Sequence, residues 1–149
     1  MQKLNLPEYS FKLKQQNGKI DVFDRIRKKY VALTPEEWVR QNFICYLIQE
    51  KNVPESLIAV EKEIKCNNMC RRTDIVVYSK LAKPVIIVEC KAPDVEIKND
   101  TFEQIVRYNM VLQVNYLVVT NGLQHYCCFI DYLDNSYHFL EYIPNYTKL

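Results

Sequence analysis

Hydrophobic residues gather in two short β-branched runs near the middle of the chain, at positions 74–78 and 84–91, with a five-residue polar linker between them. Apolar runs of this length joined by a short link predict a β-hairpin. If the turn is centred between Leu81 and Ala82, the numbers of facing residues sum to 163. This register fixes which side chains meet across the hairpin.

In this register Asp74 faces Glu89. Facing residues of an antiparallel pair share one side of the sheet, with Cβ atoms roughly 4.5–5.5 Å apart. Strand alternation adds Lys91 to that side and turns Cys90 away. Two carboxylates and an ammonium then converge in apolar surroundings, where charge is costly without compensation. An ordinary ion-paired cluster at a strand end is the simpler interpretation, and a metal site is the functional one.

Carboxylates and a lysine in this arrangement are typical of metal-assisted phosphodiester cleavage. Mg²⁺ usually takes one or two carboxylates together with water and substrate phosphate, and Mn²⁺ is expected to substitute for it. Such an ion polarises the phosphoryl oxygen and activates water. Asp74 and Glu89 suit the metal, while Lys91 suits the attacking water or the scissile phosphate.

The remaining periodicity predicts a mixed α/β fold. Thr34-Pro35 is a strong helix start, with Thr34 as N-cap. A helix between the Glu89 strand and the next strand implies a right-handed crossover and parallel pairing. The expected core order is αβββαβ, a mixed central sheet flanked by helices, with a polar arm before it: arm 1–19, strand 20–23, helix 35–51, strand 57–65, the hairpin, helix 100–113, and strands 116–120, 125–131 and 137–142.

Length and composition fit a single domain spanning residues 1–149. The net charge of +2 is too small to argue for nucleic acid by itself. With only two glycines, the chain lacks a phosphate-binding loop, so we expect no nucleotide cofactor. No apolar run approaches the roughly 20 residues of a membrane span, so no membrane partner is expected.

The six cysteines allow a zinc site or free thiols. Cys66 and Cys70 would need Cys127 and Cys128 as partners, but adjacent strand residues point to opposite faces and chelate poorly. Because no secretory signal precedes the domain, we expect reduced thiols and a cytoplasmic location.

A family resemblance emerges from four motifs taken together. Asp74 followed by Glu89-x-Lys91 on adjacent strands resembles the PD-(D/E)XK nuclease superfamily. The strings TPEEWVRQNFICYLIQE, RRTDIVVY, VIIVECKAP and FEQIVRYN resemble the N-terminal nuclease domain of type I restriction enzyme R subunits, over about residues 30–131. Thr73 stands where the superfamily often has proline. In R subunits a helicase motor follows this domain, and we expect no motor within residues 1–149.

The resemblance implies a restriction-endonuclease-like fold, Mg²⁺-dependent DNA hydrolysis and further site residues. Glu36, four residues before Arg40, would help hold the metal; alternatively it complements the helix dipole and pairs with Arg40. Gln104 would act beside the catalytic groups, and Tyr108 would contact DNA. Without the resemblance, these two read as a solvated amide and an interfacial ring.

Arg71 and Arg72 precede Asp74 and are candidates for bidentate contacts with the DNA backbone, or form a solvated strand end. The expected partners are DNA and either a second copy of the chain or other restriction-system subunits. Two functions remain open at this point. One is a metal-dependent DNA endonuclease domain, and the other is a catalytically silent module that keeps the nuclease scaffold for binding or assembly.

Overall fold

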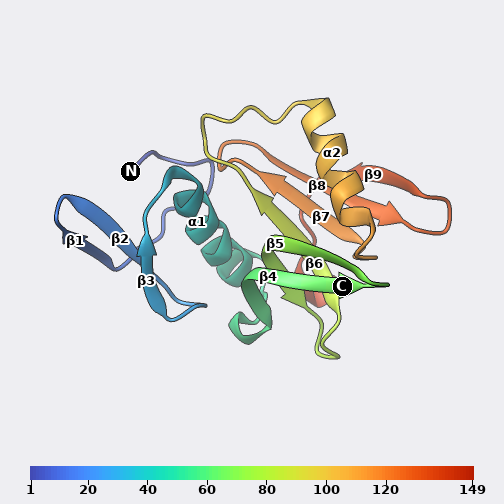
Figure 1. The fold of residues 1–149 in the computed structure, drawn as a ribbon, viewed down its shortest axis with the longest axis horizontal. Helices are drawn as coiled ribbons and strands as arrows, with labels where there is room; N and C mark the ends of the chain where they lie inside the picture. The colour runs from blue at the N-terminus through green and yellow to red at the C-terminus, as the bar shows by residue number, and fades with distance from the viewer.

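The computed structural model describes residues 1–149, which form a six-stranded mixed sheet, a separate three-stranded sheet and two α-helices (Figure 1). The elements in chain order are β1 Leu13–Gln16, β2 Lys19–Asp24, β3 Lys29–Ala32, α1 Pro35–Glu50, β4 Ile58–Cys66, β5 Met69–Tyr78, β6 Pro84–Cys90, α2 Asn99–Met110, β7 Tyr116–Thr120, β8 His125–Asp131 and β9 Ser136–Leu140, with short 3₁₀ turns at Glu55–Leu57 and Tyr146–Lys148.

The large sheet has its strands in the order β4-β5-β6-β7-β8-β9. Only β6 and β7 are parallel, and α2 makes the crossover between them. The other neighbours are antiparallel. A mixed sheet was predicted from the helix between these two strands, and the structure confirms it.

Helix α1 begins as the sequence predicts. The Thr34 hydroxyl accepts a hydrogen bond from the Glu37 backbone N–H at 3.1 Å, and Pro35 occupies the first turn. Val39, Phe43 and Leu47 are fully buried against the sheet. Each buried side chain of this size contributes roughly 1.5–3 kcal/mol relative to an exposed one, so packing holds α1 on this face.

The large sheet has a hydrophobic cluster on each face. Alternation along β5 sends Ile75 and Val77 into the cluster under α1, and Val76 into the cluster under α2. Cys127 and Cys128 divide in the same way, as expected for strand neighbours, and all six cysteines are free thiols. Neither helix combines the length and apolar character that a membrane crossing requires.

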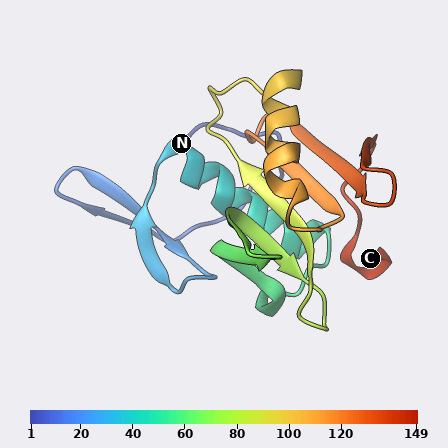
Figure 2. The same cartoon turned by 45° about the vertical axis from the view of Figure 1, so that its right-hand side comes forward.

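The N-terminal region differs from the irregular arm expected for residues 1–19. Residues Leu13–Gln16 form β1, which turns at Asn17-Gly18 into β2 and continues the small sheet to β3. Figures 1 and 2 both show this sheet extending from the body beside α1. The prediction failed because β1 carries four exposed side chains and no apolar alternation marks it.

Candidate functional site

The site predicted from the hairpin lies where β5 and β6 separate. Their register pairs Ile75 with Val88 and Val76 with Ile87, so the predicted sum of 163 holds. Pairing stops one position before Asp74 and Glu89. Beyond it, β5 stays paired with β4, while β6 continues beside β7 to Cys90. The two carboxylates therefore stand at a fork in the sheet.

Asp74 is held from both sides of this fork. Its Oδ2 accepts the Cys90 backbone N–H at 2.7 Å, which replaces the missing ladder bond between β5 and β6. Its Oδ1 accepts a hydrogen bond from Arg40 Nη2 of α1 at 3.2 Å. The carboxylate is thus fixed by one strand and one helix.

Glu89 is the most strongly perturbed carboxyl of the site. Burial, followed by the negative charge of Asp74, raises its pKa to about 8, an effect partly opposed by the Lys91 ammonium and the Asn109 amide. Its Oε1 atom is buried without a hydrogen-bond partner. A buried carboxyl with an unsatisfied oxygen beside a second carboxylate is the environment that a cation would relieve.

Lys91 and Glu36 complete the surroundings. The charge of Lys91 lowers the pKa of both Glu36 and Glu89, yet its ammonium forms no salt bridge. Glu36 Oε1 lies 3.5 Å from Arg40 Nη2, with 47% of its side chain exposed. Burial and then the charge of Asp74 raise the pKa of Glu36. The structure therefore brings Lys91 and Glu36 to the surroundings of the Asp74 and Glu89 pair.

The buried carboxylate of α1 is Glu37, the residue that follows Glu36. Its Oε1 accepts from Arg40 Nη1 at 2.9 Å and from Arg27 Nη2 at 2.7 Å, and its Oε2 accepts from Gln41. Asp24, fully buried, accepts from Arg27 in turn. A chain of alternating charges thus runs from the small sheet through α1 to Asp74.

The predicted DNA-contacting residues form contacts within the protein. The Arg71 guanidinium lies 4.5 Å from the centre of the Tyr108 ring and donates to the Tyr108 carbonyl oxygen at 3.0 Å. Arg72 pairs with Glu61 at 3.1 Å while its side chain stays 66% exposed. Gln104 lies on the exposed face of α2 and makes no hydrogen bond to Asp74 or Glu89.

Asn109 of α2 is the site neighbour that sequence reasoning missed. It is 2% exposed, its amide donates to the Ile105 carbonyl oxygen, and its Oδ1 has no partner. The signal was present in the helical spacing. Phe102, Val106 and Asn109 fall on one stripe, and a polar residue within an apolar stripe usually has a specific partner.

Asp74 and Glu89 are the residues that could hold a hard divalent cation. No group of three or more acidic, histidine or cysteine side chains is arranged to hold a metal ion. Mg²⁺ does not require one, because it keeps several waters and takes one or two carboxylates. Asp74 and Glu89 supply two, and the unsatisfied Glu89 oxygen is where positive charge is lacking.

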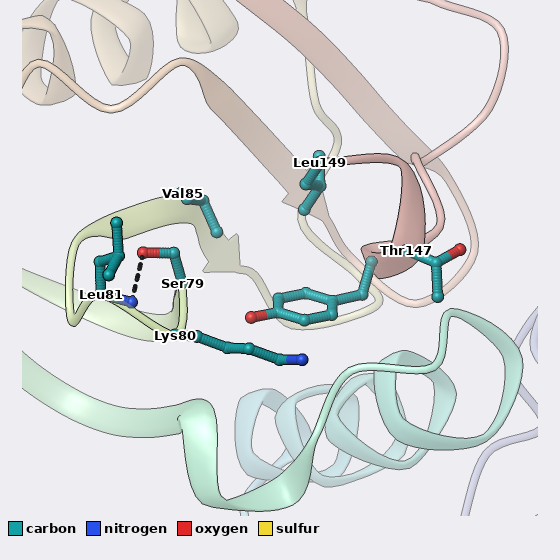
Figure 3. A pocket seen from close by; sticks show the side chains of 7 residues that line it. Ser79, Lys80, Leu81, Val85, Thr147 and Leu149 are labelled. Atoms are coloured by element: carbon teal, nitrogen blue, oxygen red, sulfur yellow. Dashed lines mark hydrogen bonds between the residues drawn. The ribbon is translucent and has the colours of Figure 1, made fainter.

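A hollow lies at the other end of the same hairpin (Figure 3). It measures about 530 Å³ and is lined by Ser79, Lys80, Leu81, Val85, Tyr146, Thr147 and Leu149. Five residues of extended chain separate Ser79 from Asp74, roughly 17 Å at about 3.3 Å each. The hollow contains no acidic side chain, so we do not place the chemistry there.

Fold and site together define a mixed α/β protein with paired carboxylates at a fork between two sheet strands. Residues 35–144 match the family described as type I restriction enzyme R protein N terminus (HSDR_N), and the chain belongs to this family. No curated protein matches the chain.

Among solved structures, the chain is similar to a fragment assigned to the HsdR subunit of a type I restriction enzyme from Vibrio vulnificus YJ016. The TM-score is 0.52 at 17% sequence identity, over 76% of this chain. The match spans only 24% of that fragment, and at this identity it supports the fold alone.

Proposed function

We propose that this chain is a metal-dependent DNA endonuclease domain of the type I restriction kind, with the restriction-endonuclease-like fold of the PD-(D/E)XK superfamily. One observation carries the proposal. Asp74 and the buried, unsatisfied Glu89 lie together at the fork of β5 and β6, with the unpaired ammonium of Lys91 beside them. Family membership supports the same class of chemistry.

Each residue has a role in the proposed reaction. Asp74 and Glu89 would hold Mg²⁺ or Mn²⁺, with Glu36 as a further oxygen donor. The ion, when bound, would polarise the scissile phosphate and favour ionisation of the attacking water. Lys91 would orient that water or balance negative charge that develops on the phosphate. Arg40 fixes the Asp74 carboxylate at 3.2 Å, so that it does not have to reorder during the reaction.

The structure also gives a reason to keep the second candidate function. Both Asp74 oxygens already accept hydrogen bonds from the protein, one from Arg40 and one from Cys90. A site that neutralises its own aspartate in this way suits a silent scaffold that serves binding or assembly in a restriction system, with DNA or other subunits as partners.

Plasmid nicking and metal titration separate the two functions. We expect nicking with Mg²⁺ or Mn²⁺, none with EDTA, and none from Asp74→Asn or Lys91→Ala. Lys80→Ala, an exposed lysine at the far turn of the hairpin, is the matched control and should nick normally. Calorimetry should show Mn²⁺ binding that Asp74→Asn weakens. A folded wild-type chain that neither binds Mn²⁺ nor nicks DNA would refute catalysis and favour the silent module.

A further inference from the structure

The positive charge of the chain is concentrated in the small N-terminal sheet. Residues 12–30 contain seven basic and two acidic residues, a net charge of +5. The whole chain carries +2, so the remainder carries −3. A modest net charge therefore hides a basic segment joined to an acidic body.

Most of this charge has no partner within the protein. Arg25 pairs with Glu55, and Arg27 pairs with Asp24 and Glu37. The five lysines of the segment are exposed and form no salt bridge: Lys12, Lys14, Lys19, Lys28 and Lys29. Unpaired ammonium groups at this density favour a polyanionic partner.

Three of these lysines share a face with two aromatic rings. Lys14 faces Asp21, and Phe23 faces Tyr30 across the sheet. The Phe23 N–H bonds to the carbonyl oxygen of Lys12, which sets Lys12 in the same row as the rings. Alternation along the strands places Lys19 there too. Asp21 is the only acidic residue among them.

The rings hold two of the lysine side chains on this face. Lys12 Nζ lies 5.7 Å from the centre of the Phe23 ring, and Lys14 Nζ lies 5.6 Å from that of Tyr30. The rings themselves meet edge to face at 5.3 Å. Cation–π contacts orient an ammonium group without neutralising its charge, so less side-chain entropy is lost when a phosphate binds.

A hollow lies beside this face, and a series of ion pairs links the small sheet to the candidate site. Lys12, Phe23 and Lys28 line a hollow of about 440 Å³ between the small sheet and α1. The ion pairs of Arg27 with Glu37, and of Arg40 with Asp74, connect the turn after β2 to the fork of the large sheet. Both ribbon views show β1 and β2 reaching outward from the body (Figures 1 and 2).

We infer that the face of the small sheet formed by Lys12, Lys14, Lys19, Phe23 and Tyr30 is a docking surface for the phosphate backbone of DNA. It is separate from the Arg71 and Tyr108 region beside the fork. The positive charge of the face favours DNA as the ligand, because an anionic, regularly spaced backbone complements exposed lysines without base contacts. The inference rests on the proposed function only in naming DNA as the polyanion.

The test measures binding of the whole chain to a short fluorescent duplex in EDTA, where no metal-dependent cleavage occurs. A triple change of Lys12, Lys14 and Lys19 to Gln should weaken binding at least tenfold at low salt. It should also reduce the log–log salt slope by about 0.9 for each lost phosphate contact. The same three positions changed to Arg should keep wild-type binding, because the charge remains.

The matched control changes the same number of exposed lysines outside the small sheet, namely Lys80, Lys83 and Lys148 to Gln. Equal weakening by both triple variants would overturn the inference, because only total charge would then matter. The inference would also be overturned if the Lys12, Lys14 and Lys19 to Gln variant bound DNA like the wild type but began to self-associate. Lysines on an edge strand also block strand pairing between copies, and that would then be their role.

Failure of the proposed function is distinguishable from failure of this inference. A chain that binds duplex through the small sheet but never nicks DNA refutes catalysis alone. The docking surface alone is refuted if the wild type nicks DNA and the Gln variant of Lys12, Lys14 and Lys19 binds DNA as tightly as the wild type. Circular dichroism of each variant checks that the fold is retained.

Discussion

Replacing Glu89 with Gln should make the metal-free protein more stable at neutral and alkaline pH. Gln keeps the shape of the side chain and removes its charge. The pKa of Glu89 is about 8, against an ordinary value of 4.5. Between these values the folded state keeps a proton that the unfolded state has released, so the free energy of unfolding falls as pH rises and levels off above pH 8.

The size of the effect follows from the pKa difference. At about 1.36 kcal/mol per unit, the raised pKa of Glu89 lowers the free energy of unfolding by roughly 3 kcal/mol at pH 7 and by at most roughly 5 kcal/mol above pH 8. At pH 5 the wild-type carboxyl is already protonated in the fold, and the variant should match it within about 1 kcal/mol. The gap between the two proteins should therefore open with rising pH.

Urea unfolding in EDTA from pH 5 to pH 9 measures this gap. Trp38, the only tryptophan, hydrogen-bonds to the Gln2 carbonyl oxygen and packs on Phe11, which makes its fluorescence a probe of unfolding. Glu63→Gln removes an exposed carboxylate from β4 and is the matched control. Because other titrating groups are common to all three proteins, the differences between them report Glu89.

Two outcomes would refute this reasoning. Parallel stability curves for wild type and Glu89→Gln from pH 5 to pH 9 would mean that Glu89 is not held neutral by the fold. Saturating Mg²⁺ should also stabilise the wild type at pH 8, and the variant less, because a bound cation favours the carboxylate. Equal stabilisation of both would remove Glu89 from the metal site.

Three further predictions concern Lys91, Arg40 and the binding of DNA. Lys91→Ala should abolish metal-dependent nicking yet keep Mn²⁺ binding and the urea midpoint, because its charge serves the transition state and not the core; wild-type nicking would remove this lysine from the mechanism. Arg40→Met should cost on the order of 3 kcal/mol in urea unfolding at pH 7, because Glu37 and Asp74 lose their shared cation; a loss below about 1 kcal/mol would contradict the ion-pair chain. Wild-type binding to duplex DNA should be weak, steeply salt-dependent and indifferent to sequence in anisotropy titrations; tight, sequence-selective binding at physiological salt would show that side chains read bases.

The parts of the fold that follow from local rules could be predicted from sequence. Thr34 and Pro35 set the start of α1 because capping is a local interaction. The strands at Tyr116–Thr120 and His125–Asp131 have the predicted bounds because a short apolar run is itself a sequence signal for a buried strand. The hairpin register also held, with an irregularity at Tyr78 absorbed near the turn.

The parts that depend on distant partners could not be predicted. Glu36 was the carboxylate of α1 expected to act in the site, but Glu37 is the buried one, because Arg27 in the turn after β2 reaches it. The second helix was expected to begin at residue 100, whereas α2 begins at Asn99 after the N-cap Lys98, which makes no capping side-chain bond. The sequence around Glu37 and around the start of α2 does not show which distant residues will contact them in the fold.

The chain of ion pairs from Asp24 to Asp74 sets a limit on how this protein can be shortened. The family match begins at residue 35, yet Arg27 supplies one of the two counter-charges of Glu37, and Leu4 belongs to the core under α1. A version cut at the family boundary would leave Glu37 with Arg40 as its one cation and open the apolar layer beside Gly122, where Leu4 packs closely. The smallest autonomous unit therefore extends upstream of the homologous segment, and a boundary drawn from sequence similarity would cut through its electrostatic framework.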